Sequence, residues 1–455
     1  MAVWSILDSD ELARRARLDA EYFQPRYLEY EKMLSRLACV TLDDVGRVTD
    51  GIHASPDVVD EDGVRYLSAK SVKDNEFSVG DALQISRKQD AENSRTRLRE
   101  GDLLITTVGT IGNAAVVTPE ILPANIDRHL GLVRFNSDAP IDSYFAATFL
   151  NSTFGRFQTL REATGNVQLN LFIEKIKTLK IPELPVAAAI SKATRNAYDL
   201  RSKAAKLISD AEKLLTKTLD LDDLDNSPSL FYERDFTDFQ TANRFGAEYF
   251  MPCKQCVLDA LAKQPGRLLN EHCQSVRELF DATDARRGEL VRNFDLTTAL
   301  EPVLDDSTET MPAVEIGSTK KKIQAGDVVI SRLRSYLREI AVVRTSPAVA
   351  AVGSSEFIVL RPRENAKSKL TPETLLIYLR SLPVQTILKW SQDGSAHPRF
   401  DEDDLLAIPV PDSVVRIAPK IDALVNEALT ARAEAARLLE EAKAEVERLV
   451  LNSST

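Results

Sequence analysis

The chain of 455 residues lacks several features that would assign it to a common class of protein. It has only four cysteines, too few for a disulfide scaffold, which favours a reducing cytoplasm. No apolar run approaches the roughly 20 residues that span a bilayer. The N-terminus has no basic segment followed by a long apolar core. The apolar (44%) and charged (28%) fractions are ordinary for a folded protein, so we expect a cytoplasmic chain without membrane contact.

Motifs for catalysis are also scarce. The sequence contains no Gly-x4-Gly-Lys-Ser/Thr phosphate loop and no Asn/Asp-Pro-Pro-aromatic segment of the kind that amino-methyltransferases use. Gly109 and Gly112 lie between two expected strands with no helix after them, which favours a hairpin turn over a nucleotide loop. The four histidines form no Ser/His/Asp arrangement. We therefore expect no enzymatic activity and no bound cofactor.

Four residues have a partial zinc spacing: Cys253, Cys256, His272 and Cys273. The first half of the chain has no cysteines at the matching positions. Buried thiols are therefore the alternative to a structural zinc site, and we predict no metal.

What the chain does have is an internal duplication. The segment Arg17–Pro25 returns as Arg244–Pro252 with six of nine positions identical, at an offset of 227, half the chain length. Gly101–Thr106 returns as Gly326–Ser331 at an offset of 225. Three further blocks follow in the same order: the strands ending at Val117 and Val343, the Leu-x-Ile-Pro segments at 179–182 and 406–409, and a long helix that closes each half.

Each long helix has apolar or small residues at alternating spacings of four and three, the seam of a coiled coil. In the first copy the seam runs from Val186 to Leu221, and in the second from Ile417 to Leu449, broken at Glu445 with Val446 as a possible substitute. Matched seams favour pairing of the two helices with each other, with two independent surface helices as the alternative. A helix over 186–221 would be about 54 Å long.

The segments before each helix predict a mixed α/β fold. In the first half we expect strands at 65–67, 102–107 and 113–117 and helices at 142–152 and 169–179. In the second half we expect strands at 328–331, 340–344 and 357–360 and a helix at 373–380. Short helices should follow Pro25 and Pro252, and the acidic stretch 220–243 is the expected linker.

The net charge of −11 is unevenly distributed. Residues 316–344 hold seven Lys or Arg against two acids (net +5), and residues 84–99 hold five against two (net +3). Residues 205–240 are acidic, with a net charge of −5. A basic cluster in each half suits phosphate contacts with nucleic acid, with an ordinary solvated face as the alternative.

With these blocks in hand, nearly the whole chain resembles the specificity (S) subunits of type I restriction–modification systems. Asp50-Gly51-Ile52-His53 is similar to the family's Asp-Gly-Thr-His segment, and Arg65–Val72 to its next strand and turn. Gly101–Ile105 followed by Gly109–Gly112 is similar to its Gly-Asp-Ile-Leu…Gly-x-x-Gly signature.

The resemblance implies two α/β (α+β) target recognition domains in a pseudo-twofold arrangement, separated by two long antiparallel coiled-coil helices. Each domain would bind one half of a bipartite target in double-stranded DNA. The helices would set the gap and dock DNA methyltransferase subunits, expected to be two. S-adenosylmethionine, ATP and magnesium would belong to partner subunits, including an ATP-dependent restriction subunit where one is present.

The expected domain bounds follow from the duplication. They are an N-terminal helical segment (1–40), target recognition domain 1 (41–185), the central helix (186–221), a linker and short helix (222–268), target recognition domain 2 (269–412) and the C-terminal helix (413–450).

The loops differ between the copies where two readers of different sequences should differ, with neutral loop divergence as the alternative. We expect phosphate contacts from Arg95, Arg97, Arg99, Lys320, Lys321 and Lys322. Base contacts are expected from Asn166, Gln168, Asn170, Arg332, Arg334, Arg338, His397 and Arg399. Partner contacts are expected from Leu200, Leu207, Leu214, Leu424, Leu438 and Leu449. The alternative function is a specificity-like adaptor for another DNA-modifying or phage-defence complex that does not read DNA itself.

Overall fold

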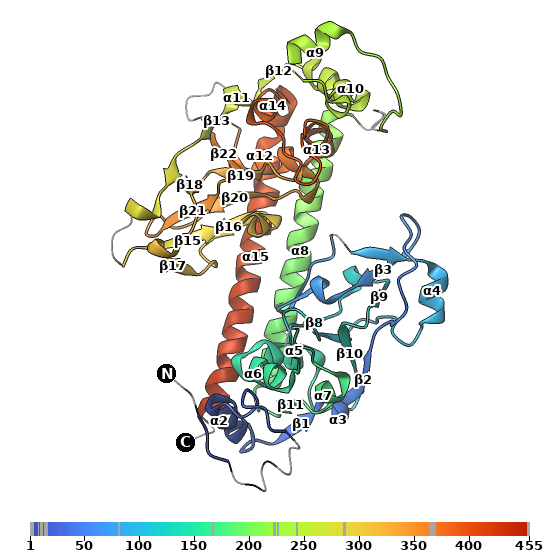
Figure 1. The fold of residues 1–455 in the computed structure, drawn as a ribbon, viewed down its shortest axis with the longest axis vertical. Helices are drawn as coiled ribbons and strands as arrows, with labels where there is room; N and C mark the ends of the chain where they lie inside the picture. The colour runs from blue at the N-terminus through green and yellow to red at the C-terminus, as the bar shows by residue number, and fades with distance from the viewer. Residues whose placement is uncertain are drawn as a thin grey trace. The chain divides into compact units, whose positions relative to one another are not determined.

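The computed structural model divides the chain into two compact units. Unit 1 comprises residues 1–202 and 432–455, and unit 2 comprises residues 203–431. The structure describes residues 4–7, 9, 12, 17–80, 82–165, 168–221, 224, 227–242, 244–284, 288–363 and 370–452. Each unit is an α/β body that includes half of each long helix, as the ribbon shows (Figure 1), which confirms the expected fold class.

Unit 1 has a four-stranded sheet in the order β2-β10-β7-β8 and a three-stranded sheet in the order β6-β3-β9. The first contains β2 (Gly46–Asp50), β10 (Leu130–Phe135), β7 (Leu103–Thr106) and β8 (Ala114–Val116). The second contains β6 (Leu83–Ile85), β3 (Val64–Leu67) and β9 (Ala124–Ile126). Two short pairs complete the strands: β1 (Cys39–Thr41) with β11 (Lys180–Pro182), and β4 (Val72–Lys73) with β5 (Glu76–Phe77).

Unit 2 repeats this plan with longer sheets. Its first sheet has the order β13-β22-β19-β20-β16 and contains β13 (Cys273–Val276), β22 (Phe357–Pro362), β19 (Val328–Ser331), β20 (Ile340–Arg344) and β16 (Val303–Asp305). Its second has the order β14-β18-β21-β15-β17 and contains β14 (Leu279–Phe280), β18 (Lys320–Ile323), β21 (Ala350–Ser354), β15 (Leu290–Phe294) and β17 (Thr310–Pro312). The short pair is β12 (Gly266–Leu268) with β23 (Pro409–Pro411).

The central strands are uniformly apolar because both of their faces are buried. In β7, Leu103 and Ile105 pack on the helices, and Leu104 packs on the core shared with the second sheet. In β19, Val328 and Ile330 face the helices while Val329 faces the other core. The expected strands and hairpins of both halves are therefore confirmed.

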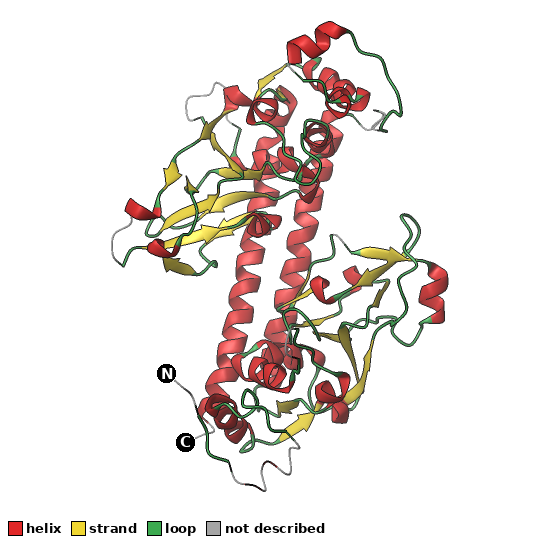
Figure 2. Cartoon of the chain, viewed as in Figure 1, coloured by secondary structure: helices red, strands yellow, loops and turns green. Residues whose placement is uncertain are grey.

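Apart from α4 in unit 1 and α9 in unit 2, the described shorter helices follow the same order in both units (Figure 2). In unit 1 they are α2 (Pro25–Leu34), α3 (Leu42–Val45), α4 (Arg87–Glu92), α5 (Ser143–Asn151), α6 (Thr153–Glu162) and α7 (Ile173–Lys177). In unit 2 they are α9 (Phe236–Ala242), α10 (Pro252–Ala262), α11 (Leu269–His272), α12 (Pro372–Arg380), α13 (Leu382–Lys389) and α14 (Glu402–Leu406). The helices expected after Pro25 and Pro252 and at 142–152 and 373–380 are confirmed, and that at 169–179 is the shorter α7.

The two long helices are α8 (Ala187–Leu219, 33 residues) and α15 (Asp412–Asn452, 41 residues). In unit 1, Ala197 packs with Ala435 and Leu439. In unit 2, Lys203 Nζ lies 2.7 Å from Glu427 Oε1. Residues later in α8 contact residues earlier in α15, so the two helices are antiparallel, as predicted.

The predicted seam is correct at many of its positions and wrong by one residue at several others. Ala197 and Ala211 are buried as predicted, but Thr194 and Leu215 are buried in place of Ala193 and Leu214. On α15, Ile421, Ala428, Ala431, Ala435 and Ala442 are buried as predicted, whereas at other positions the buried residue is one later, including Val446 in place of Glu445. The reason is that each helix also packs on the α/β body, which turns its buried face away from the leucine side of the seam.

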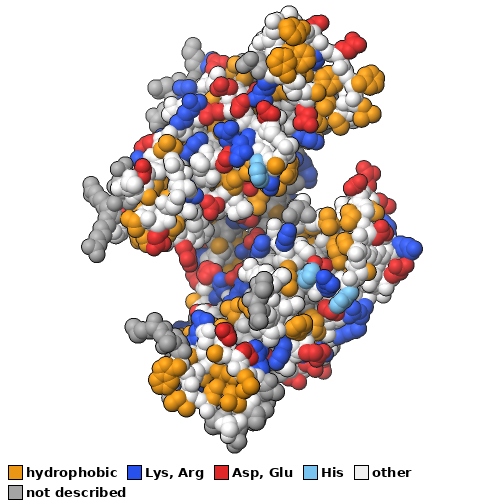
Figure 3. All heavy atoms as spheres, in the orientation of Figure 1, with side chains coloured by type: hydrophobic (Ala, Val, Ile, Leu, Met, Phe, Trp, Pro, Cys, Tyr) orange, Lys and Arg blue, Asp and Glu red, His pale blue; other side chains and the backbone are white. Residues whose placement is uncertain are grey.

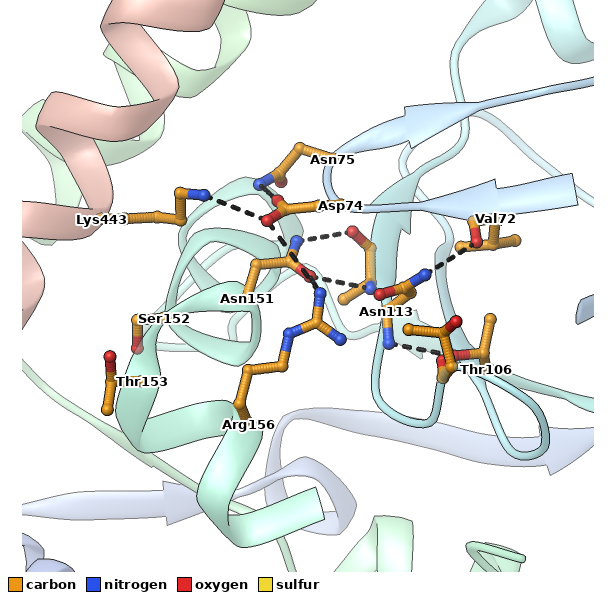
Figure 4. A network of polar contacts seen from close by, with 12 residues as sticks. Val72, Asp74, Asn75, Thr106, Asn113, Asn151, Ser152, Thr153, Arg156 and Lys443 are labelled. Atoms are coloured by element: carbon orange, nitrogen blue, oxygen red, sulfur yellow. Dashed lines mark hydrogen bonds and ion pairs between the residues drawn. The ribbon is translucent and has the colours of Figure 1, made fainter. Parts of the chain in front are cut away.

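Polar contacts fix the body of unit 1 to its helices, as Figure 4 shows. Lys443 of α15 lies 3.0 Å from the Asp74 carboxylate in the β4–β5 turn, and Arg156 of α6 lies 4.0 Å from the same oxygen. The Asn151 side chain bonds both the amide and the carbonyl of Ala114 in β8, at 3.1 and 2.7 Å. These contacts link the β4–β5 turn, strand β8 and the helices α5, α6 and α15 within unit 1.

Candidate nucleic-acid interface

Three backbone hydrogen bonds define equivalent positions at one end of the first sheet in each unit. In unit 1 the Thr107 amide donates to the His129 carbonyl at 3.1 Å, and in unit 2 the Arg332 amide donates to the Glu356 carbonyl at 3.0 Å. Asn170 and Arg399 each form a two-bond bridge across the loop that contains them. The equivalent pairs are therefore Thr107 and Arg332, His129 and Glu356, and Asn170 and Arg399.

In unit 2 these positions form a charged cluster. Arg399 donates to both carboxylate oxygens of Glu356, with its Nη2 at 2.8 Å from Oε1 and its Nε at 3.0 Å from Oε2. Arg332 Nε lies 3.9 Å from the same carboxylate. The hydrogen bond from Arg399 lowers the pKa of Glu356, so this carboxylate stays ionised between two guanidinium groups.

The turn between β19 and β20 lies against the same loop. The Arg334 amide donates to the Pro398 carbonyl at 2.9 Å, and Arg334 Nη2 lies 3.2 Å from His397 Nδ1. Arg334 and Arg338 flank a short 3-10 turn with φ of 50° and 52°, and Tyr336 between them is 62% exposed. The structure therefore brings the predicted residues Arg332, Arg334, Arg338, His397 and Arg399 to one surface.

The same turn in unit 1 is built on glycine. Gly109 and Gly112 have φ of 69° and 81°, in the places that Arg334 and Arg338 occupy in unit 2. Glycine adopts this left-handed conformation without strain. The expected hairpin is confirmed, and unit 1 has no side chain at the two positions where unit 2 has arginine.

The predicted loop residues of unit 1 lie beside this hairpin. Gln168 is exposed, and Asn170 is half-buried with its backbone bonded to Thr164. Asn166 lies outside the described residues. Their contact with bases stays a prediction.

Most of the charged side chains in the two basic stretches predicted to bind phosphates already have partners within the protein. Lys320 is 9% exposed and its ammonium lies 3.0 Å from Asp295, while Lys322 lies 2.6 Å from Glu278. Lys321 is half-buried and donates to the Phe357 carbonyl at 2.6 Å; burial lowers its pKa. Lys320 therefore has little surface left for a phosphate and is not part of the interface proposed below.

In unit 1, Arg95 lies 3.7 Å from Asp50 and Arg97 is paired with Asp90. Arg99 is exposed; its backbone amide donates to the Asp102 carboxylate at 2.8 Å, and its carbonyl accepts from the Asp102 amide at 3.1 Å. Figure 3 shows acidic and basic side chains interspersed on the visible face. The local basic charge of the sequence is thus largely neutralised by neighbouring carboxylates.

One matched ion pair was missed by the sequence reasoning. Arg134 donates to both oxygens of Asp102 at 2.8 and 2.6 Å, and Arg361 donates to both oxygens of Asp327 at 2.7 and 2.9 Å. Both aspartates are buried. The two arginines are 227 residues apart, the offset of the duplication, and this repeat was the available signal.

The leucines predicted to contact partners have the same degree of burial on the two long helices. All six are half-buried beside the buried seam: Leu200, Leu207, Leu214, Leu424, Leu438 and Leu449. They therefore keep part of their apolar surface, and their role in partner binding stays a prediction.

Neither a metal-binding cluster nor a membrane-spanning helix occurs within the described residues. Within them, no three His, Cys, Asp or Glu side chains are placed to hold a metal ion, and Cys256 is exposed while Cys253 and Cys273 are buried. Among the helices that are described, none is long and apolar enough to cross a membrane.

The chain was compared with known proteins. No protein-family model and no curated protein matches it. Among solved structures it is similar to the S subunit of a type I restriction–modification system from M. genitalium, at 14% identity over 89% of this chain and 95% of that chain, with a TM-score of 0.41. It is also similar to the HsdS subunit from Thermoanaerobacter tengcongensis (17%, 90% and 95%, TM-score 0.29) and to a chain of a type I restriction–modification assembly (18%, 91% and 96%, TM-score 0.28). These are the kind of subunit that the sequence motifs resemble, and each likeness extends over both units.

Proposed function

We propose that this chain is a DNA-specificity subunit of the type I restriction–modification kind, in which each unit binds one half of a bipartite DNA target. The observation that carries the proposal is that two copies of one scaffold keep their strands and helices but differ in chemistry at equivalent surface positions. Thr107, His129 and Asn170 in unit 1 correspond to Arg332, Glu356 and Arg399 in unit 2. Different polar groups on one frame suit the recognition of two different base sequences.

The unit 2 cluster has the chemistry that direct base reading needs. Arginine pairs bidentately with the O6 and N7 atoms of guanine. Arg334 and Arg332 have half-exposed side chains on the surface formed by the 332–338 turn and the 394–399 loop. Arg399 already spends its Nε and Nη2 on Glu356, so we assign base contacts to Arg332 and Arg334 before Arg399.

The long helices suit a docking role in the same proposal. Their half-buried leucines lie beside the seam, where a partner helix would cover the remaining apolar surface. The partner we propose is a DNA methyltransferase that brings S-adenosylmethionine, with two copies as the expected number because the helix is duplicated. This chain itself would supply recognition and no chemistry.

The test is selection of binding sites by the purified full chain from duplexes with randomised sequence, alone and with a co-expressed methyltransferase. The expected result is enrichment of a motif with two specified parts and an unspecified gap. Stable binding of the methyltransferase without any enriched motif would contradict DNA reading and support the adaptor alternative. Methyl transfer by the isolated chain would contradict the assignment of chemistry to a partner.

A further inference from the structure

A groove of about 590 Å³ opens in unit 1 next to the surface described above. Three segments line it: residues 52–56, residues 68–71 and residues 127–129, together with Tyr66, Ala82 and Leu83. Tyr66 is buried, and this burial raises the pKa of its hydroxyl to about 12. The groove is therefore a shaped depression whose rim carries polar and charged side chains. We call it the His53 groove.

Two cationic side chains at the His53 groove have no partner among the residues that the structure describes. Lys70 and Arg128 are exposed, and neither side chain makes an ion pair or hydrogen bond with any residue that the structure describes. Most other arginines of this body differ: Arg95, Arg97 and Arg134 are each paired with an aspartate. Cations without a protein partner are those free to neutralise an external anion.

The acidic groups of the groove are already occupied. The Asp50 carboxylate is 2.5 Å from His53 Nε2 and 3.7 Å from Arg95. Asp127 accepts from the His129 amide at 2.9 Å and lies 3.0 Å from His129 Nδ1. Arg95 offsets the charge of Asp50, and the contacts with Asp50 and Asp127 orient the two imidazole rings.

The groove is continuous with the surface that holds the predicted reading loop. The His129 carbonyl accepts from the Thr107 amide at 3.1 Å, and the Thr107 carbonyl accepts from the Leu171 amide at 2.9 Å. A strand of DNA that passed Gln168 and Asn170 would therefore meet His129 and then the groove. On the face drawn in Figure 3, histidines (pale blue) lie at the surface among basic side chains.

Unit 2 has different residues at the equivalent positions. The residue 227 positions after His53, the offset of the duplication, is Phe280, which is buried in a cluster with Val291, Ala313 and Val352. The position of His129 is Glu356, which holds Arg399. The residues at these two positions of the groove in unit 1 are therefore not kept in unit 2.

We propose that the His53 groove binds a phosphate of the DNA backbone through Lys70 and Arg128, and that His53 and His129 contact the same strand. This inference rests on the proposed function and adds residues that the basic stretch of the sequence did not indicate. It replaces the paired Arg95 and Arg97 as the main phosphate contacts of unit 1.

The test compares the salt dependence of DNA binding for the full chain and for the double variant Lys70→Gln/Arg128→Gln. On a mixed-sequence duplex of about 40 base pairs, loss of two phosphate contacts should reduce the slope of log K against log salt by about two units. The matched control is Lys73→Gln/Lys192→Gln, which removes two exposed lysines of unit 1 outside the groove and should leave the slope unchanged.

The outcomes separate this inference from the function on which it rests. An unchanged slope in the groove variant, with wild-type binding intact, would overturn the inference and leave the function standing. Absence of DNA binding by the wild type would overturn both. If the groove variant melts at a lower temperature, Lys70→Arg/Arg128→Lys decides: recovery of the wild-type slope supports phosphate contact, and failure to recover it contradicts the inference.

Discussion

The two units share a frame and differ in how they connect it to the long helices. In unit 1 Asp142, the N-cap residue of α5, accepts a hydrogen bond from the Ser191 hydroxyl of α8. In unit 2 the residue at the same place before α12 is Thr371, which donates to Asp422 of α15 at 2.6 Å. The carboxylate and the hydroxyl have exchanged elements. The comparison shows that a duplicated interface can keep its hydrogen bond while each body becomes matched to its own helix.

The same contrast holds at the surface, where unit 1 has glycines in the hairpin and histidines beside it, and unit 2 has arginines held by Glu356. Both units nevertheless keep the buried Asp–Arg pair. The difference at this surface therefore leaves that shared contact in place. The experiments that follow test which contacts are common and which belong to one unit.

The largest effect should come from the shared ion pair. Arg361→Met leaves the fully buried Asp327 without its partner and should lower the free energy of unfolding by about 3–5 kcal/mol. Arg134→Met should cost a similar amount, measured by urea denaturation. Arg277→Met, which breaks an exposed pair with Glu402, is the control and should leave the free energy of unfolding nearly unchanged. A large loss of stability in one unit only would contradict the conclusion that the two units share this stabilising ion pair.

Changes at Thr371 and Asp422 should be strongly coupled in their effect on the free energy of unfolding. Thr371→Asp keeps a good helix cap but places a second carboxylate beside Asp422, whose pKa burial already raises, and should cost about 2–3 kcal/mol. Adding Asp422→Ser copies the unit 1 pair and should recover most of that loss. Additive costs in this double-mutant cycle would show that the exchange is incidental.

The hairpin glycines should differ from the arginines that replace them. Gly112→Ala would put a Cβ at 2.2 Å from Thr159 Oγ1 at a φ of 81°, and should cost about 1–3 kcal/mol. Arg338→Gly relieves a left-handed residue and should be neutral or stabilising by about 0.5–1 kcal/mol. Thermal unfolding of both variants measures this, and a stabilising Gly112→Ala would refute the packing argument.

The smallest effect should be a pH dependence confined to unit 2. Burial lowers the pKa of Lys254, whose ammonium lies over the Tyr249 ring, to about 8. Between that value and the unfolded pKa of about 10.4 the folded state holds fewer protons, so stability should rise with pH, by about 1 kcal/mol from pH 8 to pH 9. Lys254→Met should abolish this rise. In unit 1 the cation over the matching Tyr22 ring is Arg161, which stays protonated at these pH values.

Much of this architecture follows from the sequence. Continuous apolar runs such as Leu103–Ile105 require burial on both faces, and the repeat offset places the same strand at Val328–Ile330. The seam positions that were wrong could not be found from periodicity, because the packing of α8 on α5 buries Thr194 and not Ala193, which the spacing favoured.

The candidate site was predicted only in part, because register decides which distant residues meet. Arg332, Arg334 and Arg399 could be proposed as a group from their places in matched loops. Glu356 follows a strand and joins them only through pairing of β19 with β22. Lys320 was misleading for the converse reason: its charge is visible in the sequence, but the partner that buries it, Asp295, is 25 residues away.

The central claim, one reader in each unit, is tested most directly by the Arg334→Ala variant in the site-selection experiment. The account predicts that specificity relaxes in one half of the enriched motif, with a loss of about 1–3 kcal/mol at a single base position, while the other half is unchanged. An equal loss on all DNA sequences, or relaxation of both halves together, would contradict it.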